Sequence, residues 1–294
     1  MEENLKRIKA AVQSLKIALP DGRMMPRLGQ GTWRMGENPL RYENEAAALS
    51  EGIRLGMTLI DTAEMYGSGG AEEMAAKAVR EFSRDELFLV SKVYPHNAGR
   101  SHIFKSCEAS LGRLQVDFLD LYLLHWRGSV PLRETVECMQ KLKKDGLIKG
   151  WGVSNFDRAD MEELWNIPGG NECCTNQVLY HLGSRGIEFD LIPWMRERGV
   201  PVMAYSPLAQ AGRLRSGLLK SQSVLEVCRR RQAQPGQVLI AFALRQGIVI
   251  PKATNPEHVA QNAAAALIEF TNEDIDILSR EFPAPKTRQP LDMS

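Results

Sequence analysis

The sequence contains no apolar run close to the roughly 20 residues that a helix needs to cross a bilayer, so we expect no membrane partner. It also lacks an excess of charge of either sign, because 37 Lys and Arg residues balance 36 Asp and Glu residues for a net charge of +1. This balance gives no electrostatic reason to expect binding to nucleic acid. The segment 1–9 is charged and has no apolar core, so we expect no secretory signal.

The five cysteines show neither a Cys-x-x-Cys motif nor the Cys/His spacing of a metal site, so no metal is expected. An odd, unpatterned set is typical of buried free thiols in a reducing cytoplasm, which is where we expect this protein. The adjacent Cys173 and Cys174 could form a redox switch. Their position at the start of an apolar strand favours ordinary packing instead.

Strand-like and helix-like segments alternate over the 294 residues, a length compatible with one large barrel domain. Several strand candidates are nearly continuous apolar runs, as expected for strands covered on both faces. The candidates span 28–32, 58–61, 87–92, 119–125, 149–154, 175–179, 200–206 and 249–252. No Gly-x-Gly-x-x-Gly motif follows the first of them, which argues against an open doubly wound sheet. The pattern therefore predicts an α/β fold of the (β/α)8 TIM-barrel class.

The segments between these strands carry helical spacing and helix-end signals. In one segment, apolar residues recur at i, i+4, i+8 and i+11, namely at Ile103, Cys107, Leu111 and Leu114. Asp157 is the predicted N-cap of the helix after the fifth strand. Gly247 is predicted to stop the helical segment before the last strand.

Two features precede the first strand. Segment 17–25 contains an Asp-Gly turn, which predicts a β-hairpin that could cap the bottom of the barrel. Segment 1–16 has apolar residues at helical spacing, and a short helix or disorder is about equally compatible with it. We therefore predict an N-terminal extension over 1–16 and a single barrel domain over 17–294.

Four polar residues stand at or just beyond the ends of neighbouring strands. Asp61 ends the second strand candidate and Tyr66 follows it, while Lys92 and His125 end the third and fourth candidates. A buried polar group is costly unless it is paired, so the repetition suggests a shared polar site. Because the carboxyl ends of barrel strands open to one mouth, we expect the four side chains to meet there.

Each of the four residues could contribute differently to the reduction of a carbonyl group. Tyr66 is the candidate proton donor, although an unperturbed phenol has a pKa of about 10. A Lys92 ammonium would lower that pKa, and Asp61 would hold the ammonium in place. Neutral His125 could donate a second hydrogen bond to the carbonyl oxygen. An Asp–Lys pair alone is usually structural, but four such groups on consecutive strand ends favour catalysis.

Several short motifs occur in a specific order, and together they resemble the aldo-keto reductase superfamily from about residue 17 onward. They are Gly-Gln-Gly-Thr-Trp at 29–33, Asp-Thr-Ala-Glu-Met-Tyr-Gly at 61–67, Leu-Leu-His-Trp at 123–126, Gly-Val-Ser-Asn-Phe at 152–156, Thr-Asn-Gln at 175–177, Tyr-Ser-Pro at 205–207 and Ile-Pro-Lys at 250–252. Segments 91–95 and 180–185 resemble a bacterial subgroup associated with methylglyoxal. The resemblance implies an NADPH-dependent oxidoreductase that reduces small aldehydes or α-oxoaldehydes such as methylglyoxal, with Asp61, Tyr66, Lys92 and His125 as its catalytic tetrad.

The resemblance also implies a site for NADPH or NADP. The implied residues are Gly31, Thr32, Trp33, Asp61, Ser154, Asn155, Gln177, Tyr205, Ser206, Leu208, Lys252, Thr254, His258, Gln261 and Asn262. Tyr205 can stack on the nicotinamide, and Lys252 with the following helix N-terminus can bind the 2′-phosphate. His258 stands where many members carry arginine, and neutral imidazole is the weaker phosphate ligand. NADP remains the expectation because Lys252 and the helix terminus remain.

The expected substrate residues are Trp33, Tyr66, Tyr94, His125 and Trp126. The tail that follows residue 285 is short, so we expect it to add little wall to the pocket. A cofactor-binding regulatory subunit with little turnover is the alternative function, and oxidation of alcohols is the alternative direction. The sequence does not predict the oligomeric state.

Overall fold

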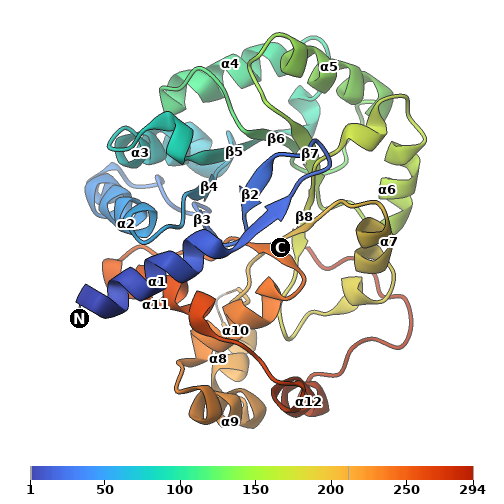
Figure 1. Cartoon of the computed structure of the whole chain (residues 1–294). Coiled ribbons are helices and arrows are strands. Elements are labelled where there is room, and N and C mark those ends of the chain that lie inside the picture. Colours follow the sequence, from blue (N-terminus) through green and yellow to red (C-terminus); the bar gives the residue numbers. More distant parts are fainter. Residues whose placement is uncertain (1, 211, 294) are drawn as a thin grey trace.

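Eight parallel strands form the centre of the molecule, as the sequence predicts (Figure 1). The computed structural model describes residues 2–210 and 212–293. The strands are β3 (Gly29–Gly31), β4 (Leu59–Asp61), β5 (Phe88–Val93), β6 (Leu121–Leu124), β7 (Trp151–Ser154), β8 (Asn176–Leu179), β9 (Val202–Tyr205) and β10 (Gly247–Val249). They pair in chain order, and a parallel bridge between Leu28 and Val249 joins the first strand to the last. The sheet therefore closes into the predicted barrel.

The last strand starts earlier than predicted. Gly247 does not stop the preceding helix but is the first residue of β10, while that helix already ends at Leu244. A Cβ at Gly247 would lie 2.2 Å from the carbonyl oxygen of Val202, so the close approach of β9 requires glycine there. The ladder ends before Pro251, which has no N–H to donate to a neighbouring strand.

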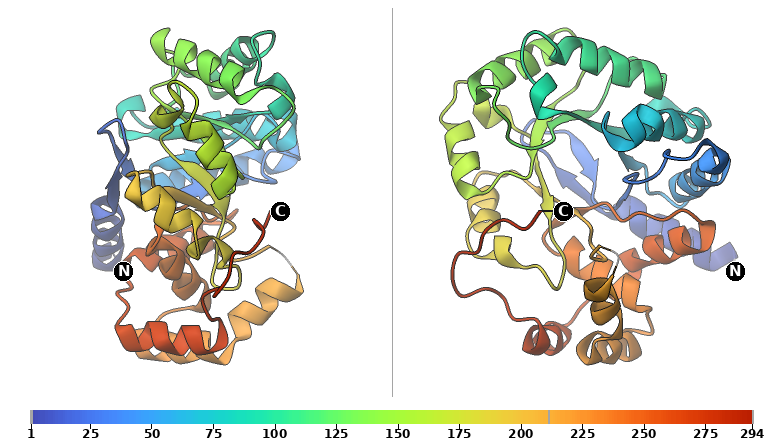
Figure 2. Two further views of the ribbon diagram at one scale, coloured as in Figure 1. Left: turned by 90° about the vertical axis from the view of Figure 1, so that its right-hand side faces the viewer. Right: turned by 180° about the vertical axis from the view of Figure 1, so that it is seen from behind.

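Helices cover the outside of the barrel on all sides (Figures 1 and 2). They are α1 (Glu2–Ser14), α2 (Tyr42–Arg54), α3 (Gly70–Val79), α4 (Ile103–Leu114), α5 (Leu132–Lys144), α6 (Arg158–Trp165), α7 (Leu191–Glu197), α8 (Arg213–Lys220), α9 (Gln222–Arg231), α10 (Pro235–Leu244), α11 (Pro256–Ala264) and α12 (Asn272–Glu281). The predicted spacing of α4 is confirmed, because Ile103, Cys107 and Leu111 are buried. Asp157 is the N-cap of α6 and accepts a hydrogen bond from the backbone N–H of Asp160 at 2.9 Å. No helix within the described ranges is both long and apolar enough to cross a membrane.

The predicted hairpin is present as the antiparallel strands β1 (Lys16–Ala18) and β2 (Met24–Pro26). Its side chains Leu19 and Met25 are buried in the cluster that fills the barrel interior, together with Leu121 and Met203. The hairpin thus closes the end of the barrel opposite the carboxyl ends of the strands. Before it, α1 packs against α11 (Figure 1).

The five cysteines are free and buried. Burial raises the pKa of Cys173 well above its ordinary value and raises the pKa of Cys174 to about 11. Because the thiolate is the reactive form, this environment supports packing rather than a redox switch for the adjacent pair.

Candidate functional site

The four predicted polar side chains meet at the carboxyl end of the barrel. The Lys92 ammonium donates hydrogen bonds to Asp61 Oδ2 at 2.7 Å and to the carbonyl oxygen of Thr62 at 2.9 Å. It also donates to the Tyr66 hydroxyl at 3.3 Å. Lys92 is fully buried and Asp61 is 2% exposed, so this ion pair has little contact with solvent. Tyr66 and Asp61 both line the open pocket, whereas Lys92 does not.

Burial and the nearby opposite charges have opposing effects on the pKa values of Lys92, Asp61 and Tyr66. For Lys92, burial lowers the pKa, but Asp61 and Tyr66 together outweigh it and keep the net pKa above the ordinary value. For Asp61, burial raises the pKa more than Lys92 and Gln177 lower it. Burial also raises the pKa of Tyr66, and Lys92 opposes that rise without reversing it. Lys92 thus lowers the pKa of Tyr66 as expected, but the net pKa stays above the ordinary value because desolvation of the phenolate is the larger effect.

His125 lies beside the phenol and is neutral. Its ring centroid is 5.6 Å from that of Tyr66 in an edge-to-face arrangement. Burial, with a smaller contribution from Lys92, lowers the pKa of His125 to about 2. Its Nδ1 atom has no hydrogen-bond partner within the described ranges. The imidazole can therefore donate or accept a hydrogen bond at neutral pH without carrying a charge.

The backbone turn after β4 places Tyr66 over Lys92. The 3-10 helix η2 (Tyr66–Gly69) contains Gly67 at φ +57° and Gly69 at φ +96°, conformations that glycine adopts without strain. The helix α3 follows at once, and its fully buried Glu72 accepts a hydrogen bond from the Ser91 hydroxyl at 2.5 Å. Glu72 therefore joins α3 to the strand residue that precedes Lys92.

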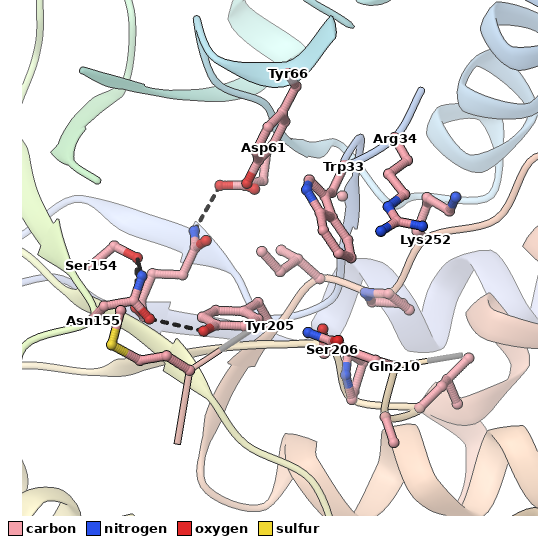
Figure 3. Close-up of a pocket in the computed structure, with 18 of the residues that line it drawn as sticks. Trp33, Arg34, Asp61, Tyr66, Ser154, Asn155, Tyr205, Ser206, Gln210 and Lys252 are labelled. Carbon is pink, nitrogen blue, oxygen red and sulfur yellow. Dashed lines mark hydrogen bonds between the residues drawn. The ribbon is translucent and has the colours of Figure 1, made fainter. Parts of the chain in front are cut away.

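A pocket of about 520 Å³ opens above this group (Figure 3). Its lining residues are Gly31, Trp33, Arg34, Asp61, Met65, Tyr66, His125, Trp126, Ser154, Asn155, Gln177, Tyr205, Ser206, Pro207, Leu208, Ala209, Gln210, Arg215, Ile250, Pro251, Lys252 and Met293. The two ends of the pocket differ in the groups that line them. Carboxylate, phenol and amide groups lie at one end, and the cationic side chains of Arg34 and Lys252 lie at the other.

A hydrogen-bonded row of side chains fixes the amide end. Gln177 Nε2 donates to Asp61 Oδ1 at 2.7 Å, and the Ser154 hydroxyl donates to the carbonyl oxygen of Gln177 at 2.8 Å. The Tyr205 hydroxyl donates to Asn155 Oδ1 at 2.8 Å and fixes the orientation of the Tyr205 ring at the pocket wall (Figure 3). The site thus presents a flat aromatic surface beside polar amide groups.

Some expected site residues lie outside the pocket lining. These are Thr32, Lys92, Tyr94, Thr254, His258, Gln261 and Asn262. Lys92 lies directly beneath Tyr66, and the Thr32 hydroxyl donates to the carbonyl oxygen of Asp61 at 3.1 Å. Tyr94 packs edge-to-face on Trp126, with ring centroids 5.8 Å apart. His258 belongs to the N-terminal turn of α11, where its backbone N–H donates to the N-cap Asn255 at 2.8 Å.

Other lining residues are not among the individual site residues expected from the sequence: Arg34, Met65, Pro207, Ala209, Gln210, Arg215, Ile250, Pro251 and Met293. Met293 corrects the expectation that the tail adds little wall. The tail after α12 runs back toward the barrel mouth (Figure 2). Arg288 anchors it through Asp157 Oδ2 at 3.4 Å and Asp190 Oδ2 at 3.3 Å. These contacts let a short tail reach the pocket, although no local sequence signal marks Met293.

Comparison with known proteins agrees with this geometry. Methylglyoxal reductase YeaE of Escherichia coli (strain K12) is 55% identical over 271 residues, which cover 92% of this chain and 95% of that protein. Glyoxal reductase of Bacillus subtilis (strain 168) is 32% identical over 88% of this chain and 90% of its own length. A crystal structure of an aldo/keto reductase from Klebsiella pneumoniae in complex with NADP and acetate has a TM-score of 0.92 and 50% identity, and the match covers 95% of this chain and 99% of that one. The sequence model of the Aldo/keto reductase family matches residues 27–280, and the chain belongs to that family.

Proposed function

We propose that this chain is an NADPH-dependent oxidoreductase that reduces small aldehydes or α-oxoaldehydes such as methylglyoxal to alcohols. The observation that carries the proposal is the position of Tyr66, which lines the pocket beside the neutral His125 and whose hydroxyl lies 3.3 Å from the Lys92 ammonium. The identity of 55% to a methylglyoxal reductase supports the substrate class.

The residues of the pocket fit an NADP cofactor. A dinucleotide needs a flat apolar contact and amide partners for its nicotinamide and cations for its phosphates. Tyr205 with Asn155 and Gln177 supplies the first set, and Lys252 with Arg34 supplies the second. Gln210 Nε2 lines the pocket and, among the described residues, is a buried donor without a partner. A polar ligand would satisfy it.

When bound, NADPH supplies the hydride for the carbonyl carbon. The negative charge that develops on the carbonyl oxygen requires a proton, and the Tyr66 hydroxyl donates it. Lys92 stabilises the resulting phenolate, and Asp61 holds the ammonium in place at 2.7 Å. His125 hydrogen-bonds the same oxygen and orients the carbonyl group. The buried position of the Lys92–Asp61 pair strengthens these electrostatic effects.

The remaining assignments of the sequence analysis are part of the proposal. Ser154, Asn155 and Gln177 bind the nicotinamide amide, while Ser206 and Leu208 lie along the pyrophosphate and ribose. Thr254, His258, Gln261 and Asn262 belong to the loop and helix at the adenosine end. Trp33, Tyr94 and Trp126 border the substrate.

We also propose that the partners are small carbonyl compounds and not nucleic acid or membranes, and that the enzyme acts in the cytoplasm. The division into an extension over 1–16 and one barrel domain over 17–294 belongs to the same proposal. The packing of α1 on α11 means that the extension contacts the barrel directly.

Steady-state NADPH oxidation tests the function. Methylglyoxal and short aldehydes should support turnover better than bulky ketones or sugars, and NADH should replace NADPH poorly. Tyr66→Phe keeps the ring but removes the acid, so its rate should fall at least about a hundredfold. The Kd for NADPH should change little, which serves as the folding control. If the wild type binds NADPH but shows no measurable turnover, the result would favour the regulatory alternative. The presence of all four tetrad residues does not support that alternative.

A further inference from the structure

Three cations gather at the end of the pocket away from Tyr66. Arg34 follows β3, Arg215 lies in α8 and Lys252 follows β10, so the side chains come from distant parts of the chain. The charged ends of Arg34 and Lys252 lie next to each other (Figure 3). We refer to Arg34, Arg215 and Lys252 as the basic cluster.

Within the described ranges, no carboxylate lies at ion-pair distance from the basic cluster. Glu45 and Glu37 act on Lys252 only through space, and Glu45 instead accepts a hydrogen bond from the backbone N–H of Gly36 at 2.8 Å. Burial lowers the pKa of Lys252, Arg34 and Arg215 lower it further, and the two glutamates oppose them. Like charges held together in this way are stabilised by a bound anion.

Arg34 reaches this site with a strained backbone conformation. Arg34 adopts φ +60°, a left-handed conformation that is uncommon for a side-chain-bearing residue. Its guanidinium lies over the Trp33 ring, 4.6 Å from the ring centroid, which restricts the side chain. Strained residues of this kind concentrate at ligand sites, where the surrounding structure holds them in place.

We propose that Arg34 is a cofactor-specificity residue that binds the 2′-phosphate of NADP together with Lys252. This proposal rests on the proposed function. It also accounts for His258, which stands where many family members carry arginine. Arg34, which follows β3, supplies the guanidinium that α11 lacks. Guanidinium binds phosphate through two parallel N–H donors, whereas neutral imidazole offers one donor and no charge.

Calorimetric titration of the intact protein with NADPH and with NADH tests the proposal without relying on turnover. Arg34→Ala should weaken NADPH binding by about tenfold to a hundredfold, the effect of one lost charge-assisted hydrogen bond, and should leave NADH nearly unchanged. Lys252→Ala should show the same selectivity. Arg213→Ala, a neighbouring α8 arginine outside the pocket lining, removes the same charge and should alter neither affinity.

A rescue variant sharpens the test. His258→Arg in the Arg34→Ala protein should recover most of the lost NADPH affinity if both positions serve the same phosphate. Equal weakening of NADPH and NADH in Arg34→Ala, or no weakening, would overturn the assignment. Failure of the wild type to bind either cofactor would contradict the proposed function itself, so the two failures are distinguishable.

Discussion

At the scale of single residues, the site balances the desolvation of Tyr66 against the charge of Lys92. Burial raises the phenol pKa, and the ammonium 3.3 Å away partly offsets that rise. Asp61 neutralises the ammonium and at the same time disfavours the phenolate. The pKa of the Tyr66 phenol therefore depends on the charge of Lys92, which Asp61 in turn holds in place.

Replacing Lys92 by methionine should raise the pKa of Tyr66 further, because the one favourable charge is lost. The phenol then becomes a weaker acid, so the rate of reduction should fall across the whole pH range. A neutral phenol loses activity as the pH rises through its pKa, so the alkaline limb of the pH–rate profile should move upward. Identical profiles for Lys92→Met and wild type would contradict the assigned coupling.

At the scale of elements, an ion pair with a buried carboxylate joins α3 and α4, two helices that follow the Tyr66 turn. Arg113 of α4 donates to Glu72 Oε2 at 2.6 Å, while Ser91 of β5 donates to the other carboxylate oxygen. Glu72 is fully buried, so these two side chains take the place of water as its hydrogen-bond partners. The three side chains together connect α3, α4 and β5 behind Lys92.

Arg113→Met should destabilise the protein by about 3–5 kcal/mol, the typical cost of leaving a buried charge uncompensated. Urea unfolding at neutral pH measures the change in free energy. Lys105→Met removes a charge from an exposed position of the same helix and should have little effect. The double variant Glu72→Gln with Arg113→Met should be more stable than Arg113→Met alone. A small effect of Arg113→Met would mean that solvent reaches the carboxylate.

At the scale of the whole molecule, two buried histidines make stability depend on pH. Burial lowers the pKa of His181 to about 4 and that of His125 to about 2, both below the ordinary value of 6.5. His181 is 1% exposed and its Nδ1 accepts a hydrogen bond from the backbone N–H of Gly183 at 3.1 Å. Both rings are therefore neutral in the folded protein at pH 5, whereas they are charged in the unfolded chain.

Because the unfolded chain binds more protons below pH 6.5, stability should fall as the pH decreases from 6.5 toward 4. The loss is roughly 2 kcal/mol per histidine between pH 6.5 and 5. Urea unfolding at pH 7 and pH 5 measures it. His181→Gln should lose about half of this pH dependence, and exposed His102→Gln should retain it all. Equal stability of the wild type at both pH values would show that the histidines are not buried as neutral rings.

The barrel and the meeting of four polar side chains at its mouth were predictable because their signals are local. Apolar runs mark the strands, and the polar residues Asp61, Lys92 and His125 come at their carboxyl ends. Once the chain forms parallel strands, those ends must meet at one mouth. The hairpin was predictable for the same reason, since an Asp-Gly turn determines its own pairing.

Other features depended on contacts between distant segments. The net pKa of Tyr66 follows from its burial, which the sequence does not state. Arg34 and Met293 reach the pocket only because a strained loop and an anchored tail bring them there. The sequence by itself determined the strands, their order and the chemical groups at their ends, because these follow from short-range patterns. Only the tertiary structure decided which loop and tail residues complete the pocket and how strongly burial shifts each charge, because both depend on long-range packing.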